Sequence, residues 1–453
     1  MTFLYQQLLS WDPEQESHEE IELKFTFRRE FWRYFGDRVD SATSERIHAK
    51  ARQFLAMLED SRPDYRDLVR EIIFDALFRL PRFHPAEHGL EGEELGYVRS
   101  VLDELEDDIV RHGETGLSHI IRGALRVAVG EHESGYRHFG QARLKLPEEH
   151  HSQHHAGVMT VYDPLTIDER RGRKRGGIIS EPVLVAETGQ GAPQNPAFFS
   201  TMDPVFFICF ARRYLVSLLS SNPGHAVVMS VLDASPDFLE WAAARVREWA
   251  PEESAVFLFS QTVHVSDKKP VFASARFLSA AAIAAHIDRD LLILDADMEA
   301  WRPMKKFDQL FGKAEIGLNV NQGYPGHLPW RKINASQLYF DHGSEFAHMF
   351  LDKANRYFLA AYDEEKSTNW WIDQNALAAA FFAFSQDEFY SVSPKDRRLA
   401  DLCYGKWTQI RQQKYRLREG VATRRDMIAE ACTLYDRGDW DRFDAMAGRT
   451  IAG

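Results

Sequence analysis

The chain has 453 residues, a formal net charge of −13 and a hydrophobic fraction of 44%. This length indicates two or three domains, with enough apolar residues for a large core. The acidic balance argues against a non-specific nucleic-acid binder, because such proteins need a basic face. Three widely separated cysteines, Cys209, Cys403 and Cys432, exclude a disulfide framework and are typical of a reducing compartment.

The sequence shows no sign of a signal peptide or of a membrane-spanning segment. The first residues lack the basic and apolar regions of a signal peptide, and the segment is already acidic at Asp12. No apolar run reaches the roughly 20 residues that span a bilayer, since the run that begins at Val205 is interrupted by Arg212 and Arg213. We therefore expect a cytoplasmic protein with no transmembrane segment, and peripheral membrane association stays open.

Residues 1 to 145 are expected to form a helical N-terminal domain. Apolar residues recur at helical spacing, with charges between them, in four segments: Ser44–Leu58, Tyr65–Leu80, Gly92–His112 and Gly116–Phe139. The stretch from Gly123 to Ala142 resembles part of a tetratricopeptide hairpin, but it occurs once and without a fixed period. An irregular helical domain is the interpretation that we favour.

Residues 146–195 are expected to be a linker or a long loop. They contain a histidine-rich run over 148–155, a basic run over 170–175 and a Gly/Pro-rich stretch. Histidines four residues apart share a helix face and bind transition metals, and a basic run binds phosphates or an acidic membrane surface. Plain solvated loops are the explanation that we favour for both runs.

From residue 196 the pattern changes to alternating strands and helices. The expected strands are 197–200, 226–231, 255–260 and 291–294, and the expected helices are 206–220, 236–248 and 273–286. This alternation predicts βαβ units around a mainly parallel sheet, hence the α/β class, over residues 196–415. Residues 416–453 are expected to be C-terminal helices, with 422–435 and 439–446 as a hairpin.

The strand Leu291–Leu294 is followed directly by Asp295-Ala296-Asp297. Carboxylates at a strand end suit Mg²⁺ or Mn²⁺, which prefer oxygen ligands and also bind substrate phosphates. Such a pair also occurs by chance as a turn cap. Ligands in such sheets bind beyond the carboxyl ends of the strands, where Asp203 should also lie.

Four further segments surround this motif in chain order: Phe198–Asp203, Ala273–Leu278, Ile333–Phe340 and Trp371–Leu377. With Asp295-Ala296-Asp297 they resemble the nucleotide-diphospho-sugar glycosyltransferases of GT-A fold. The resemblance is strongest to the retaining glycosyltransferase family eight and its relatives, over about residues 196–410. It implies a Rossmann-type mixed sheet.

The resemblance also implies where a nucleotide would bind. Thr201 and Asp203, at the end of the first strand, would contact the base and ribose. Arg276 and Lys406 would contact the diphosphate. As alternatives, Asp203 before Pro204 simply begins a helix, and Arg276 pairs with a surface carboxylate.

In the same resemblance, Asp297 would hold Mn²⁺ or Mg²⁺, and Asp295 would contact the ion or the ribose. Asp373 would bind hydroxyls of the donor sugar, and Gln374 would lie at its reactive face. Asp373 and Gln374 are otherwise ordinary helix-face residues. Asn334, in the segment near the acceptor, is more simply structural.

One departure from the family concerns its third metal ligand, a histidine within His-x-x-Gly-x-x-Lys. The nearest segment here is Cys403-Tyr404-Gly405-Lys406-Trp407, which has the glycine and the lysine but no preceding histidine. Water or another side chain would replace that ligand, or Lys406 and Arg276 would hold the diphosphate themselves. The departure also leaves room for a protein that binds a nucleotide without turnover.

These inferences predict a metal-dependent glycosyltransferase that moves a sugar from a UDP-sugar to a glycan or protein acceptor, with retention. One alternative is a non-catalytic scaffold that binds nucleotide sugars. A sugar nucleotidyltransferase is less favoured, because Ser200–Asp203 lacks the glycine-rich loop that grips a triphosphate. No nucleic acid is expected as a partner.

Overall fold

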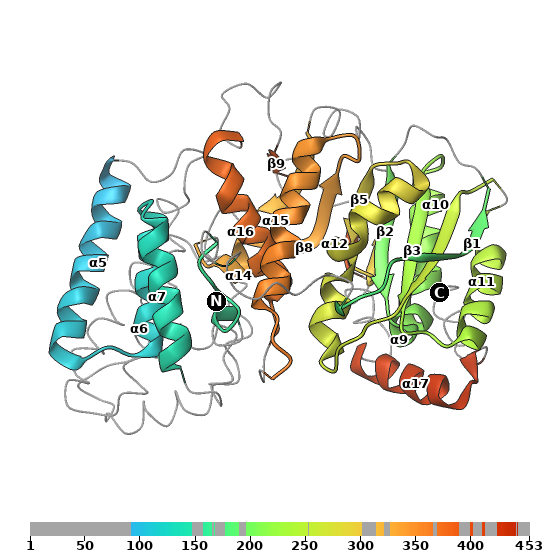
Figure 1. Ribbon diagram of the computed structural model, residues 1–453, viewed down its shortest axis with the longest axis horizontal. Helices are drawn as coiled ribbons and strands as arrows, with labels where there is room; N and C mark the ends of the chain where they lie inside the picture. Colours follow the sequence, from blue (N-terminus) through green and yellow to red (C-terminus); the bar gives the residue numbers. More distant parts are fainter. Residues whose placement is uncertain are drawn as a thin grey trace, which may run out of the picture. The chain divides into compact units, whose positions relative to one another are not determined.

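The computed structural model describes residues 92–146, 157–164, 167, 177–189, 196–251, 253–300, 314–320, 327–365, 369–388, 399–401, 410–412, 424–440 and 442. They divide into two compact units, whose elements are labelled in Figure 1. The first unit contains 92–146, 157–163, 327–332 and 369–371, and the second contains the other described residues. The expected helices 44–58 and 65–80 and the histidine-rich and basic runs lie outside the described residues.

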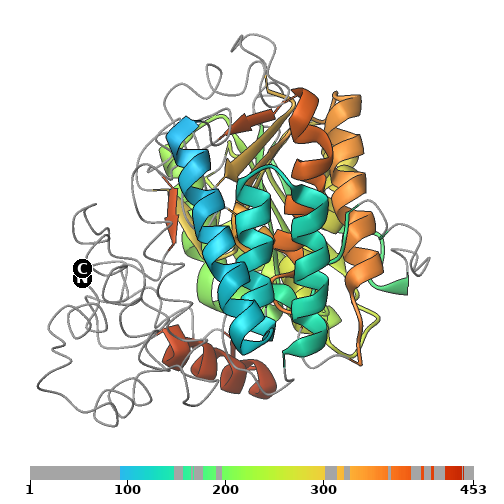
Figure 2. The same cartoon turned by 90° about the vertical axis from the view of Figure 1, so that its left-hand side faces the viewer.

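Three helices, α5 (Gly92–His112), α6 (Gly116–Ala128) and α7 (His132–Lys145), form the described core of the first unit and lie side by side in Figure 2. The helix expected at Gly92–His112 is confirmed. The single segment expected at Gly116–Phe139 is wrong, because it contains two helices. Gly130 adopts a φ of +86° just beyond α6, a left-handed conformation that ends a helix and that glycine adopts without strain.

Helices α6 and α7 pack closely through two glycines. A Cβ atom at Gly123 would lie 2.6 Å from the ring of Phe139, and one at Gly135 would lie 2.6 Å from Val127. Phe139 is fully buried and meets the ring of Trp330 at 5.7 Å between centroids. The small residues therefore bring the helix backbones together and leave room for large rings beside them.

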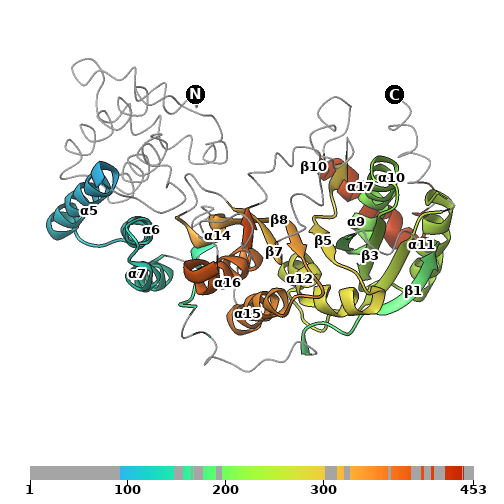
Figure 3. The same cartoon turned by 90° about the horizontal axis from the view of Figure 1, so that it is seen from above.

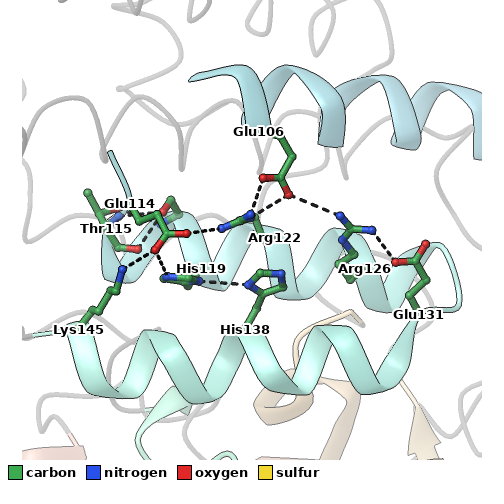
Figure 4. Close-up of polar contacts among 10 residues, drawn as sticks. Glu106, Glu114, Thr115, His119, Arg122, Arg126, Glu131, His138 and Lys145 are labelled. Atoms are coloured by element: carbon green, nitrogen blue, oxygen red, sulfur yellow. Dashed lines mark hydrogen bonds and ion pairs between the residues drawn. The ribbon is translucent and has the colours of Figure 1, made fainter. Parts of the chain in front are cut away.

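A ladder of ion pairs ties α5 to α6 and α7 (Figure 4). The guanidinium of Arg122 binds both carboxylate oxygens of Glu106 on α5, and its Nη1 lies 2.9 Å from Glu114. Lys145, near the end of α7, lies 2.6 Å from the same Glu114. Lys145 and then Arg122 hold the pKa of Glu114 down at about 2. Partly exposed pairs of this kind contribute modestly one by one, and more as a network.

Two histidines join α6 to α7 within this ladder. The Nδ1 atoms of His119 and His138 lie 3.2 Å apart, so one ring donates a hydrogen bond to the other when both are neutral. Burial lowers the pKa of His138 to about 4, and burial also lowers the pKa of His119. The contact therefore requires at least one uncharged ring and is a structural part of this hairpin.

The second unit is built on an eight-stranded mixed sheet, which confirms the α/β class expected from the sequence. The strand order is β1-β4-β3-β2-β5-β8-β7-β9. The strands are β1 (Val183–Thr188), β2 (Ala197–Met202), β3 (Ala226–Leu232), β4 (Val256–Gln261), β5 (Leu291–Leu294), β7 (Ile316–Val320), β8 (Ile333–Phe340) and β9 (Leu399–Asp401). Strands β4, β3, β2 and β5 are parallel to one another, whereas β8 is antiparallel to β5 and β7, and β1 is antiparallel to β4.

The strand β1 lies within the segment that was expected to be a linker or a long loop. Its side chains are mostly partly exposed because it is an edge strand with one neighbour, so it lacks the continuous apolar run of the central strands. A second sheet joins β6 (Met298–Ala300) to β10 (Ile410–Gln412).

Helices cover both faces of the large sheet (Figure 3). One face carries α10 (Arg212–Ser221) and α11 (Pro236–Trp249), which contact each other, and the other carries α12 (Lys268–Ile287), which contacts α15 (Glu345–Ala361) and α16 (Ile372–Glu388). Ser235 caps α11 by accepting a hydrogen bond from the Phe238 N–H. Alternate residues of the strands, such as Phe198 and Met202 of β2, pack into the α10 core.

Two helical stretches, Pro204–Ser221 and Lys268–Ile287, are long and apolar enough to cross a membrane by length and composition. Both pack against the sheet, and 56% and 61% of them is buried within the protein. They are therefore core helices of this unit. The first is interrupted by a π-helical turn, η5 (Phe207–Ala211), between α9 (Pro204–Phe206) and α10.

The C-terminal helix α17 (Arg424–Arg437) belongs to the same core and contacts α9 and η5. An aromatic cluster fastens it: Tyr435 and Trp440 meet the ring of Phe238 edge-on at 5.5 and 5.1 Å between centroids. A helix was expected at 422–435. The helix expected at 439–446 lies largely outside the described residues.

Candidate functional site

The order of the parallel strands creates a switch point between β2 and β5. From β2 the chain moves outward to β3 and β4 and then returns through α12 to β5, on the other side of β2. Sheets of this kind bind ligands beyond the carboxyl ends of the strands where the order reverses. Asp203 follows β2 and Asp295 follows β5, so both predicted residues lie at this point.

Asp203 caps the helix that follows β2. Its Oδ1 accepts a hydrogen bond of 2.7 Å from the Phe206 N–H, and Pro204 occupies the first helical position. Burial raises the pKa of this carboxyl, and the backbone hydrogen bonds oppose the rise. The cap is thus observed, while contact with a nucleotide stays a prediction. Thr201, also buried, donates from Oγ1 to the Phe272 carbonyl at 3.4 Å.

Arg276 is the centre of the site. Its Nη2 lies 2.8 Å from Asp295 Oδ1 and 3.6 Å from Asp373 Oδ2, and it donates to the Ala335 carbonyl at 3.0 Å. The side chains of Arg276, Asp295 and Asp373 are 8%, 26% and 13% exposed. Three predicted residues from α12, the end of β5 and the start of α16 are therefore brought together, and the partners of Arg276 are partly buried carboxylates rather than fully exposed ones.

Asp373 occupies the first turn of α16. Its Oδ1 accepts a 2.8 Å hydrogen bond from the Gln374 N–H, as expected of an acidic residue at a helix start. Burial raises the pKa of Asp373, and Arg276 acts in the opposite direction. Gln374 is half-buried beside it, and its contact with a sugar stays a prediction.

The Asp-Ala-Asp motif forms a tight turn that leads from β5 to β6. The Met298 N–H donates to the Asp295 carbonyl at 3.2 Å, and the Asp295 N–H donates to the Ser336 carbonyl of β8 at 3.1 Å. Asp297 lies in this turn and is 4% exposed. Asp295, whose side chain is 26% exposed, is therefore the more accessible of the two residues.

Helix α10 holds the far side of this turn. Arg213 Nε lies 2.5 Å from Glu299 Oε2, and the Glu299 side chain is 3% exposed. One helical turn later, Ser217 Oγ accepts a hydrogen bond of 3.1 Å from the Ala300 N–H. These two contacts anchor the backbone immediately after Asp297.

The donor chemistry at this strand end is compatible with a divalent cation. Asp295 and Asp297 offer carboxylate oxygens, and magnesium sites commonly use one or two carboxylates together with water and substrate phosphates. Within the described ranges, no group of three or more His, Cys, Asp or Glu side chains is placed to hold a metal. An ion here would have to draw on water and ligand oxygens, and would compete with Arg276 for Asp295.

Two features of the site were missed in the sequence. The Arg213–Glu299 pair had a faint signal, because Glu299 continues the alternation of Asp295 and Asp297. Tyr214, in the middle of an apolar helix, had none. It is completely buried, yet it lies close enough to feel the charges of Arg276 and Asp295; burial raises its pKa far above the usual value.

The structure adds no site contact for two other predicted residues. Lys406 lies outside the described residues. Asn334 is exposed at the start of β8, where its Oδ1 accepts a 3.1 Å hydrogen bond from the Ser336 N–H, a local structural contact.

Comparison with known proteins finds likeness among solved structures. No protein-family model and no curated protein matches the sequence. Among solved structures, the chain is similar to one described as the apo structure of the WbbM bifunctional glycosyltransferase, with a TM-score of 0.31 and 11% identity. The match covers 68% of this chain and 51% of the other, so this chain spans about half the length of that protein. Activity must be argued from this chain's own residues.

Proposed function

We propose that the second unit is a glycosyltransferase that transfers a sugar from a nucleotide-diphospho-sugar, with a UDP-sugar as the expected donor. One observation carries the proposal. Arg276, Asp295 and Asp373 converge from α12, β5 and α16 beside the switch point of the sheet, where a nucleotide is expected to bind. The acceptor is expected to be a glycan or a protein, and the stereochemical outcome to be retention.

The reaction requires groups that manage charge more than it requires a reactive side chain. Breaking the bond between sugar and phosphate places negative charge on the nucleotide and oxocarbenium character on the sugar. Arg276 supplies a fixed positive charge at the site, and a guanidinium binds phosphate through paired donors. Asp373, a buried carboxylate at a helix start, is suited to accept hydrogen bonds from sugar hydroxyls.

A divalent ion is part of this proposal. Asp297, and Asp295 when it is released from Arg276, would hold Mn²⁺ or Mg²⁺. When bound, the ion would stabilise charge on the leaving diphosphate. Asp203 and Thr201 would bind the nucleoside at the end of β2. Lys406 would add a second cation for the diphosphate.

The test is a donor-hydrolysis screen with purified protein. Each common UDP-, GDP- and CMP-sugar is incubated with Mn²⁺ or Mg²⁺, and release of free nucleotide is measured. We expect metal-dependent release from one donor, lost in Asp297→Asn. Glu248→Gln, which changes an exposed carboxylate on α11, is the matched control and should keep wild-type release. Release that is the same in Asp297→Asn would refute the metal assignment.

A non-catalytic scaffold that binds nucleotide sugars is the second candidate. The observation that favours it is the ion pair between Arg276 and Asp295, since a neutralised carboxylate is a poorer metal ligand. Calorimetric titration of the donors with and without Mn²⁺ separates the two. Metal-independent binding with no release of nucleotide, with or without an acceptor extract, would favour the scaffold.

A further inference from the structure

Tyr214 presents a polar group that the folded unit does not use. Its side chain is 0% exposed, and its hydroxyl has no hydrogen-bond partner among the residues that the structure describes. A buried hydroxyl without a partner destabilises the fold, so such groups are rare in native proteins. Phenylalanine would fill the same space in this apolar helix without that cost.

The surroundings of Tyr214 contain a second unused donor. The charges of Arg276 and Asp295 both act on Tyr214, and the Nε of Arg276 is likewise buried without a partner in the described part of the chain. Both groups donate hydrogen bonds. Arg276 Nε lacks an acceptor, which an anionic ligand would supply, and the Tyr214 hydroxyl lacks one, which Asp295 would supply once it is free of Arg276.

Tyr214 is too deeply buried to contact a ligand directly. Its ring is completely buried, whereas Asp295 is 26% exposed and is the accessible member of the group. An anion arriving at this edge would attract Arg276 away from Asp295. A partly buried carboxylate that loses its guanidinium needs another donor, because leaving it unpaired is costly.

On the basis of the proposed function, we infer that Tyr214 is a positioning residue for ligand binding. Its hydroxyl donates a hydrogen bond to the Asp295 carboxylate when Arg276 leaves Asp295 and binds the phosphates of a nucleoside diphosphate. The unused phenol and the unused guanidinium Nε of the free protein are then both satisfied in the bound state. The neutral phenol is well suited to this exchange, because it donates a hydrogen bond without adding charge.

The test compares binding and stability in Tyr214→Phe, which removes only the oxygen. Affinity for UDP is measured by calorimetric titration with and without Mn²⁺, and the melting temperature by differential scanning calorimetry. We expect about tenfold weaker UDP binding, the effect of one lost hydrogen bond, with an unchanged or higher melting temperature. A tyrosine with a purely structural hydroxyl would instead lose stability and keep its affinity.

Tyr339→Phe is the matched control, since the Tyr339 hydroxyl donates to Asp290 at 2.9 Å, just before the start of β5 and at the other end of that strand from Asp295. It should melt at a lower temperature and bind UDP as the wild type does. Equal UDP affinity in wild type and Tyr214→Phe overturns this inference alone. A wild-type protein that binds none of UDP, GDP and CMP overturns the proposed function, and this inference with it.

Discussion

Replacing Arg276 with methionine should lower the free energy of unfolding of the second unit by about 3 kcal/mol, the lower end of the cost of breaking a buried ion pair. Methionine keeps much of the volume and removes the charge. Two carboxylates, Asp295 and Asp373, and the Ala335 carbonyl would lose their shared donor.

The magnitude follows from the distances. Unit charges 2.8 and 3.6 Å apart attract by roughly 6 and 5 kcal/mol at an effective dielectric constant of about 20. Removing the guanidinium from water on folding costs several kcal/mol, which offsets much of that attraction. A net loss of about 3 kcal/mol remains, and for a unit of this size it corresponds to a drop in melting temperature of roughly 6–12 °C.

Urea unfolding followed by circular dichroism measures this loss, with Arg245→Met as the control. Arg245 pairs with Glu248 on the exposed side of α11, where an ion pair contributes at most about 1 kcal/mol. The deficit of Arg276→Met should shrink at low pH, because burial raises the pKa of Asp373 and its protonated carboxyl no longer needs a cation. A loss equal to that of Arg245→Met, or independent of pH, would refute the reasoning.

Three other predictions concern both units. Arg213→Met should destabilise by about 3 kcal/mol, since it removes a charged partner of the buried Glu299 carboxylate, and Glu299→Gln in the same background should restore part of the loss in a denaturant titration. Gly123→Ala should cost about 1–3 kcal/mol by overpacking, because its Cβ would lie 2.6 Å from Phe139; an unchanged melting temperature contradicts this. Because the pKa of His138 is lowered to about 4 in the fold, its contribution is complete above its unfolded value of about 6.5 and is lost as the pH falls from there towards 4. His138→Gln should flatten that pH slope, and an unaltered slope would exclude His138 as its source.

The central sheet was predictable because burial on both faces leaves a distinct pattern. Strands such as Leu291–Leu294 are continuous apolar runs, and the polar residues after them mark the carboxyl edge. Asp203 and Asp295 could be placed at one edge on that basis alone. The edge strand β1 has only one neighbouring strand and no such run, so the sequence resembled a loop there.

The contacts within the site were harder to predict because they depend on how separate elements meet. The pairing of Arg276 with both Asp295 and Asp373 requires the packing of α12 against α16, which no local pattern specifies. The sequence likewise contains no indication that Tyr214 belongs to the site. An aromatic residue on an apolar helix face is ordinary core, and only the absence of a partner for its hydroxyl distinguishes it.

The docking of α17 has a consequence for synthesis. Phe238 is buried against Tyr435 and Trp440, which are near the other end of the chain. At roughly 5–20 residues per second, on the order of 10–40 seconds separate the emergence of these partners from the ribosome. Throughout that interval the aromatic surface on α11 is complete but uncovered. The nascent chain therefore exposes an aromatic patch on α11 until Tyr435 and Trp440 have been synthesised.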